Sequence, residues 1–175
     1  LRLGLAGNGL EDLRGLLDST RGLYVALSEY RVSWGCTDEE APKIEEAQKL
    51  ALDCMDLALR EAPARDHRFT LQHVQLADAA QFRRMKALGL CANLFANHVW
   101  YWGDQHFEVT LGPERANRID ACASAIKAGV PLAIHSDAPV TPLGPLFTAW
   151  CAVNRLTPKG RVLGNEERIS VPQAL

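Results

Sequence analysis

Residues 68–95, RFTLQHVQLADAAQFRRMKALGLCANLF, contain two strand-like runs separated by a helical pattern. The run at 68–72 carries aromatic and β-branched residues, and the run at 90–95 is short and apolar, as buried strands are. Between them, Asp78 is placed to begin a helix and Gly89 to end it. Strand, helix and strand in this order predict a βα unit with parallel strands.

The same order continues downstream. Residues 96–110 are polar and aromatic, and we expect them to form a loop. Residues 111–128 predict one continuous helix, which Gly129 ends. An apolar strand is expected at 130–134 and a further helix at 146–154. The chain therefore predicts three successive βα units.

The first 65 residues show a less regular pattern. Apolar side chains recur at helical spacing over 39–60 and predict a long helix there. Two shorter elements are also expected, a helix over 12–17 and a strand over 23–27.

Composition excludes several classes of partner. The 175 residues are 47% hydrophobic and 23% charged, with a formal net charge of -2, as in an ordinary globular protein. The basic residues are scattered, so no nucleic-acid partner is expected. Neither a membrane-spanning run nor a secretory signal is visible, so we expect no membrane association and a cytoplasmic location. The five cysteines form no CxxC pair, which indicates mostly buried free thiols.

Polar side chains follow each of the three predicted strands. His73 follows the first strand, His98 the second and Asp137 the third. In parallel βα folds, functional side chains collect at these strand ends. His73 and Asp137 are 64 residues apart, which is about two βα units of ~30 residues. They should therefore project from one rim, where an imidazole and a carboxylate suit a divalent ion such as zinc.

Each of these residues also has an ordinary structural interpretation. A histidine after a strand can be a hydrogen-bonded structural residue, and Asp137 can cap a turn before Pro139. His98 can be solvated in its loop. The aromatic residues of this loop can pack over the rim or line a pocket, and the pocket is favoured because exposing so many of them is costly.

Four ordered stretches are more specific. They are 71–76 (LQHVQL), 111–116 (LGPERA), 128–140 (AGVPLAIHSDAPV) and 161–170 (RVLGNEERIS). Together they resemble amidohydrolase family 3, a branch of the metal-dependent amidohydrolase superfamily with a (β/α)8 barrel. The resemblance covers roughly 50–175, whereas 1–48 match poorly. It implies an α/β fold, a partial TIM barrel of about the last three βα units plus an N-terminal helical segment, in one incomplete domain over 1–175.

The resemblance also implies roles for individual residues. His73 corresponds to the metal-ligand histidine at the end of barrel strand six. Asp137 corresponds to the metal-site aspartate at the end of strand eight, which is also the general base. The implied activity is hydrolysis of amide or related non-peptide C–N bonds in a small molecule, with a divalent metal, expected to be zinc. The expected substrate contacts are His98, Trp100, Trp102 and Arg115.

The sequence also departs from the family pattern. Gln72 stands where the family has glutamate, and no HxH pair or strand-four lysine is found, because His67 is the first histidine. Catalytic zinc usually has three protein ligands. We therefore expect a fragment that binds zinc weakly and hydrolyses little by itself.

Two alternative functions stay open. One is a non-catalytic barrel fragment or binding module, and an incomplete barrel would favour self-association through its open strand edges. The other is a metal-dependent phosphoester hydrolase, against which the lack of a basic, glycine-rich phosphate cradle counts.

Overall fold

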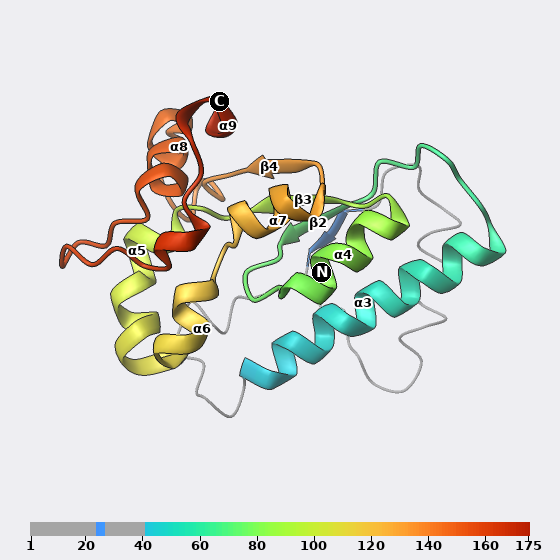
Figure 1. The fold of residues 1–175 in the computed structure, drawn as a ribbon, viewed down its shortest axis with the longest axis horizontal. Coiled ribbons are helices and arrows are strands. Elements are labelled where there is room, and N and C mark those ends of the chain that lie inside the picture. Colours follow the sequence, from blue (N-terminus) through green and yellow to red (C-terminus); the bar gives the residue numbers. More distant parts are fainter. Residues whose placement is uncertain (1–23, 27–40) are drawn as a thin grey trace.

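A parallel four-stranded sheet organises the computed structural model, which describes residues 24–26 and 41–175 (Figure 1). The strands follow one another in sequence order, β1-β2-β3-β4. Their bounds are Tyr24–Ala26 for β1, Thr70–His73 for β2, Cys91–Leu94 for β3 and Leu132–Ile134 for β4. The predicted strands and their parallel pairing are confirmed. The helix expected over 12–17 lies outside the described residues.

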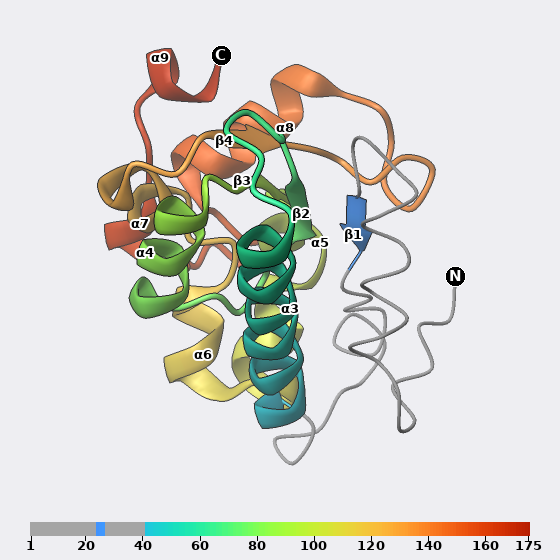
Figure 2. The same cartoon turned by 90° about the vertical axis from the view of Figure 1, so that its right-hand side faces the viewer.

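Helices connect these strands. α3 (Ala41–Glu61) precedes β2, and α4 (Ala79–Leu88) links β2 to β3. The link from β3 to β4 contains α5 (His98–Gln105), the π-helix η1 (His106–Thr110), α6 (Gly112–Arg118) and α7 (Cys122–Ala128). After β4 come α8 (Pro145–Asn154), the short 3-10 helix η2 (Asn165–Glu167) and α9 (Val171–Ala174). Helices α3, α4 and α7 lie on the same side of the sheet (Figures 1 and 2).

The two faces of the sheet differ in character. Leu71, Ala92 and Leu94 point to the helical side and belong to the main buried core with α3, α4 and α7. On the alternate strand positions, the Asn93 side chain donates a 2.6 Å hydrogen bond to Gln72, and both are only partly buried. The strands are thus apolar towards the helices and polar on the other face.

Local signals set the bounds of α4 as predicted. Asp78 accepts a 2.7 Å hydrogen bond from the Gln81 backbone, and the Gln81 side chain accepts one from the Asp78 backbone. Gly89 ends the helix with φ 72°, a conformation that costs glycine little.

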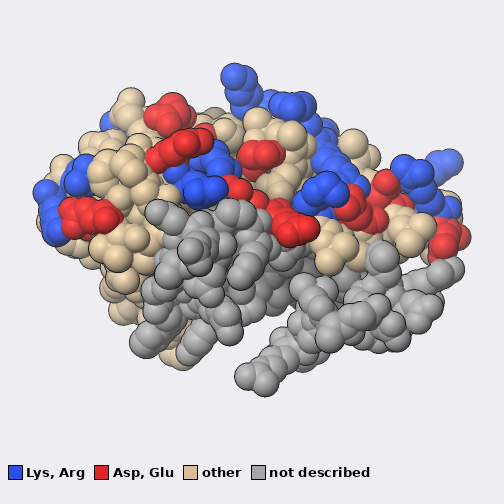
Figure 3. Space-filling model, turned by 90° about the horizontal axis from the view of Figure 1, so that it is seen from below, with Lys and Arg blue, Asp and Glu red and all other residues tan. Residues whose placement is uncertain are grey.

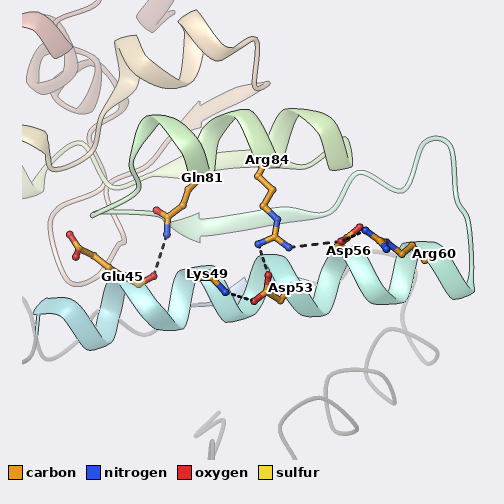
Figure 4. A network of polar contacts seen from close by, with 7 residues as sticks. All are labelled: Glu45, Lys49, Asp53, Asp56, Arg60, Gln81 and Arg84. Carbon is orange, nitrogen blue, oxygen red and sulfur yellow. Dashed lines mark hydrogen bonds and ion pairs between the residues drawn. The ribbon is translucent and has the colours of Figure 1, made fainter.

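Polar contacts align α3 with α4 (Figure 4). Arg84 of α4 contacts Asp53 at 2.5 Å and Asp56 at 3.9 Å on α3. Gln81 donates a 3.2 Å hydrogen bond to the backbone oxygen of Glu45. Such partly exposed pairs contribute about 0–1 kcal/mol each. They therefore fix the register of two helices that apolar packing holds together.

The loop expected over 96–110 is wrong, because α5 and η1 occupy this segment. Its buried residues Val99, Gly103, His106 and Thr110 recur at helical spacing. The polar and aromatic composition obscured this periodicity. A structureless connection of that length is also uncommon in compact domains.

The continuous helix expected over 111–128 is also wrong. It is broken between α6 and α7 at 119–121, where Asp120 adopts φ 47°. The Asp120 backbone nitrogen donates a 2.9 Å hydrogen bond to Gln75, and its backbone oxygen accepts one of 3.1 Å from Arg155. These tertiary hydrogen bonds replace those of a continued helix.

The cysteine prediction is confirmed where the structure describes these residues. Cys54, Cys91, Cys122 and Cys151 are free, and all except Cys91 are buried. Burial raises the pKa of both Cys122 and Cys151 to about 12, so these thiols are unreactive.

Acidic and basic side chains alternate on the surface seen in Figure 3, and neither sign forms a patch there. Among the helices that the structure describes, none is both long and apolar enough to span a bilayer.

Candidate active site

The carboxyl ends of β2 and β4 bring His73 and Asp137 together. His73 is the last residue of β2, Asp137 follows β4 closely, and β3 lies between these strands in the sheet. The distance from His73 Nε2 to Asp137 Oδ2 is 3.8 Å. The proximity predicted from sequence spacing is confirmed.

The backbone at this rim adopts conformations that non-glycine residues avoid. His73, Val74 and Asp137 have φ values of 65°, 51° and 52°. Each such residue costs roughly 1 kcal/mol or more, and such conformations cluster at functional sites. The turns they form direct both side chains over the end of the sheet.

A hydrogen-bonded clip joins the ends of β3 and β4. The buried Asn97 side chain donates a 2.8 Å hydrogen bond to Thr141 Oγ1. The Thr141 hydroxyl in turn donates to the backbone oxygen of Ser136. The clip thereby fixes the turn that carries Asp137.

Phe95 forms an aromatic floor beneath the rim. Its buried ring lies 4.0 Å from the His98 ring and 5.5 Å, edge-on, from the His73 ring, measured between centroids. It also stacks on His135 at 5.2 Å, and His135 is edge-on to His73 at 5.0 Å. Three imidazoles thus surround one phenyl ring.

Sequence reasoning assigned His135 no role. Because β4 ends at Ile134, strand alternation does not set the direction of the His135 side chain. The Asp137 backbone nitrogen donates a 3.1 Å hydrogen bond to His135 Nδ1 and turns the ring towards His73. Its position two residues before the motif aspartate was the available signal.

His98 and Asp120 form a second buried pair. His98 Nδ1 lies 3.3 Å from Asp120 Oδ2, and both side chains are almost fully inaccessible. Arg155, itself buried, donates hydrogen bonds to the backbone oxygens of Ile119 and Asp120. No sequence signal marked Asp120, because its role depends on the break between α6 and α7.

Burial keeps the imidazoles of the site neutral. Loss of solvent lowers the pKa of His98 to about 3 and that of His135 to about 4. It also lowers the pKa of His73, and the nearby Asp137 carboxylate partly offsets this effect. Burial raises the pKa of Asp120 well above its usual range, although the Arg155 charge opposes the shift. Neutral imidazole is the form that can bind a metal ion.

The other predicted contacts lie in different surroundings. Trp102 is at the site, with its ring 5.9 Å from Phe95 and 5.5 Å from His98. Trp100 instead packs against Trp150 and Phe147 in the main core. Arg115 contacts Glu45 of α3 at 3.4 Å.

His73 and Asp137 are the two residues of the rim that could hold a metal ion. A separation of 3.8 Å between His73 Nε2 and Asp137 Oδ2 is close to that of two atoms each bonded at about 2.0–2.2 Å to one ion. The buried Nδ1 of His73 makes no hydrogen bond within the described chain. No three side chains in the described part are arranged to hold one ion. These residues therefore fit half of a catalytic zinc site.

A cavity of about 690 Å³ opens beside β4. Its lining includes His135, Ser136 and Asp137 together with apolar side chains such as Leu143 and Leu146. This volume suits a small organic molecule.

The chain is a parallel βα fold that gathers imidazoles and a carboxylate at its strand ends, where the functional side chains of such folds collect. Residues 24–175 match the profile described as the Amidohydrolase family, and the chain belongs to this family. The match begins upstream of the region recognised from motifs.

One curated protein and two solved structures are similar to this chain. The chain is 30% identical over 129 residues to an N-substituted formamide deformylase of Arthrobacter pascens, covering 72% of this chain and 23% of the relative. An uncharacterized metal-dependent hydrolase from Pyrococcus horikoshii OT3 has TM-score 0.66 and 19% identity, over 94% of this chain and 30% of that one. A second uncharacterized metal-dependent hydrolase, from Pyrococcus furiosus, has TM-score 0.55 and 23% identity. This match covers 74% of this chain and 25% of that one. The chain thus spans less than a third of each relative.

Proposed function

We propose that the protein containing this chain is a metal-dependent hydrolase of amide or related non-peptide C–N bonds in small molecules. The observation that carries the proposal is the 3.8 Å approach of His73 and Asp137 at the ends of two parallel strands. The family match and the hydrolase relatives support it. A cytoplasmic location is part of the proposal.

We further propose a (β/α)8 barrel, of which this chain forms the last βα units. Parallel strands in sequence order, with α3, α4 and α7 on one side, suit a barrel segment. A doubly wound sheet would have helices on both faces and a reversal of strand order. The partial coverage of the structural neighbours agrees with a segment.

In the proposed reaction, His73 and Asp137 hold a divalent ion, expected to be zinc. Such an ion, when bound, lowers the pKa of water and polarises a carbonyl group. Asp137 accepts the proton of the attacking water and returns it to the leaving nitrogen. His73, neutral through burial, presents a ring nitrogen as a ligand.

The substrate class is proposed from the cavity and from the named relative. Leu143 and Leu146 line the same cavity as Asp137 and make part of its lining apolar, which suits an apolar substituent on the amide nitrogen. We propose His98 and Trp102 as substrate contacts, because the His98 ring lies 6.1 Å from that of His73 and 5.5 Å from that of Trp102. Trp100 and Arg115 contact other helices, and the proposal does not depend on them.

The test uses the full-length gene product, its metal content and a panel of amides and phosphate esters. We expect about one or two metal ions per chain and hydrolysis of amides only. His73→Ala should lose metal and activity, and Asp137→Asn should lose activity. His67→Ala is the matched control, because His67 bonds the Leu88 backbone oxygen away from the rim.

Three results would contradict the proposal. Preferential hydrolysis of phosphate esters would favour the phosphoesterase alternative. Absence of turnover with any substrate would favour a binding module. Full metal content in His73→Ala would show that this residue is no ligand.

A further inference from the structure

Asp137 has a backbone conformation that its surroundings must enforce. Its φ of 52° lies in the left-handed region, which non-glycine residues occupy only where the rest of the structure holds them there. With this backbone, the Asp137 carboxylate comes within 3.8 Å of the His73 imidazole. The Asp137 side chain is 36% exposed, so packing alone does not hold it. The hydrogen bonds of the surrounding backbone therefore decide where the carboxylate lies.

Two of these hydrogen bonds lie within the turn that carries Asp137. The Asp137 amide donates one of 3.1 Å to His135 Nδ1. The Asp137 backbone oxygen accepts one of 2.7 Å from the Val140 amide. Both join residues close in sequence, so they shape the turn but do not attach it to the sheet.

The clip attaches the turn to the neighbouring strand. The Thr141 hydroxyl donates a hydrogen bond to the Ser136 backbone oxygen and accepts one of 2.8 Å from Asn97 Nδ2. Asn97 is 0% exposed, and its backbone oxygen accepts hydrogen bonds from the amides of Trp100 and Tyr101 in α5. The turn is thus tied to a buried residue that is itself bonded to the helix following β3.

The direction of these hydrogen bonds leaves one atom of the clip unsatisfied. A hydroxyl has a single proton, and Thr141 donates it to Ser136, so Asn97 has to present its NH₂ group to Thr141. Asn97 Oδ1 is then buried and accepts no hydrogen bond from the described part of the chain. A buried acceptor without a donor lowers stability, and such exceptions are expected where a residue serves a functional site at the expense of the fold.

We propose that Asn97 and Thr141 are positioning residues, which act through Asp137 and set the place of its carboxylate beside His73. This inference rests on the proposed function. Asn97 and Thr141 are 0% and 1% exposed, so neither side chain reaches a substrate. A displacement of about 1 Å at a reacting group can lower a rate about 100-fold. The clip should therefore affect the rate of the chemical step and leave substrate affinity largely unchanged.

The first experiment measures kcat, per metal-loaded chain, and KM of the full-length gene product with N-butylformamide. Thr141→Val keeps the shape of the side chain but has neither donor nor acceptor. It should lower kcat by about 10- to 100-fold with little change in KM. Thr141→Ser keeps the hydroxyl group and should recover most of this loss. Equal kcat values in Thr141→Val and the wild-type protein would overturn the proposal.

Thr157→Val is the matched control. Thr157 is also 1% exposed, and its hydroxyl also links two groups, because it donates to Asp104 at 2.8 Å and accepts from the Arg161 amide at 3.2 Å. This variant should lower the melting temperature much as Thr141→Val does, while kcat stays unchanged. An equal fall of kcat in Thr157→Val would show that lost stability alone explains the effect, and would overturn the proposal.

A double variant tests whether the two residues act as one unit. Asn97→Leu removes the donor to Thr141, and Asn97→Leu with Thr141→Val should lose no more kcat than Thr141→Val alone, because Asn97 acts through Thr141. Losses that multiply would assign separate roles to the two residues and contradict the proposal.

The second experiment locates Asp137 without measuring activity. Crystal structures of the full-length wild-type protein and of Thr141→Val should differ by about 1 Å or more in the position of the Asp137 carboxylate. An unchanged carboxylate would overturn the proposal. If Thr141→Val does not fold, Asn97→Leu takes its place, because it removes the same 2.8 Å hydrogen bond from the other side.

The outcomes separate this inference from the proposed function. If the wild-type protein hydrolyses the amide and Thr141→Val is equally active, the positioning role is wrong and the proposed function stands. If the metal-loaded wild-type protein hydrolyses no amide, the proposed function fails and the inference fails with it.

Discussion

Replacing Arg155 with methionine should test whether this side chain stabilises the break between α6 and α7. Arg155 is 1% exposed, and its guanidinium donates hydrogen bonds to the backbone oxygens of Ile119, Asp120 and Leu163. Methionine fills much of the same space but removes the arginine donors to the buried Ile119 and Leu163 oxygens and one of the two donors to the Asp120 oxygen. It also removes the charge beside Asp120. Breaking a buried charged network costs about 3–5 kcal/mol, so we expect a loss of roughly 4 kcal/mol.

Urea unfolding, followed by tryptophan fluorescence, measures this change. With a slope of about 2 kcal/mol per M, the midpoint should fall by roughly 2 M. Arg60→Met is the matched control, because Arg60 forms an exposed pair with Asp56 within α3. The control should change stability by at most about 0.5 kcal/mol. A loss below about 1 kcal/mol in Arg155→Met would refute the view that this arginine holds the break between α6 and α7.

Three further predictions concern pH, packing and association. The pKa of His98 and of His106 is lowered to about 3 and that of His135 to about 4, so the unfolded chain binds more protons below the ordinary histidine pKa of about 6.5. The free energy of unfolding that these histidines contribute should be fully present above pH ~6.5 and should fall as the pH is lowered towards 4. The raised pKa of Asp120 has the opposite effect on stability and should reduce this fall. Urea midpoints that stay constant from pH 7 to 5 would contradict this prediction. Gly164→Ala should lower the melting temperature by at least several degrees, because the added Cβ would clash with the Asn117 backbone oxygen. Gly160→Ala is the control: it has φ 82° but open space around it, and it should cost only about 1–2 kcal/mol. Equal melting temperatures of the two variants in calorimetry would disprove the clash. We also propose self-association through the edge strand β4, beside which Leu143 and Leu146 are 82% and 74% exposed. Light scattering on this chain should show oligomers, and replacing both leucines with aspartate should dissociate them. A stable wild-type monomer would count against this proposal.

Local chemistry and spacing predicted the parts of this molecule that depend on nearby residues. Asp78 and Gly89 mark the bounds of α4 because capping needs only the adjacent turn. His73 and Asp137 were placed together because parallel strands in sequence order put their ends on one rim. The metal, base and substrate roles of these residues stay predictions.

The parts that were missed depend on distant contacts. Asp120 breaks a helical pattern because Gln75 and Arg155, far away in sequence, bond its backbone. His135 escaped notice because a backbone turn, and not strand alternation, orients its ring. No pattern confined to a short window of sequence contains this information.

The clip through Asn97, Thr141 and Ser136 has a mechanical consequence. It couples the end of β3 to the turn that carries Asp137, and the Asp137 amide in turn holds the His135 ring. These hydrogen bonds join the end of β3, the turn that carries Asp137 and the His135 ring. Differences in substrate size would then be accommodated by Leu143 and Leu146, which also line the cavity, so substitutions there should alter which substrates fit while the rim chemistry stays the same.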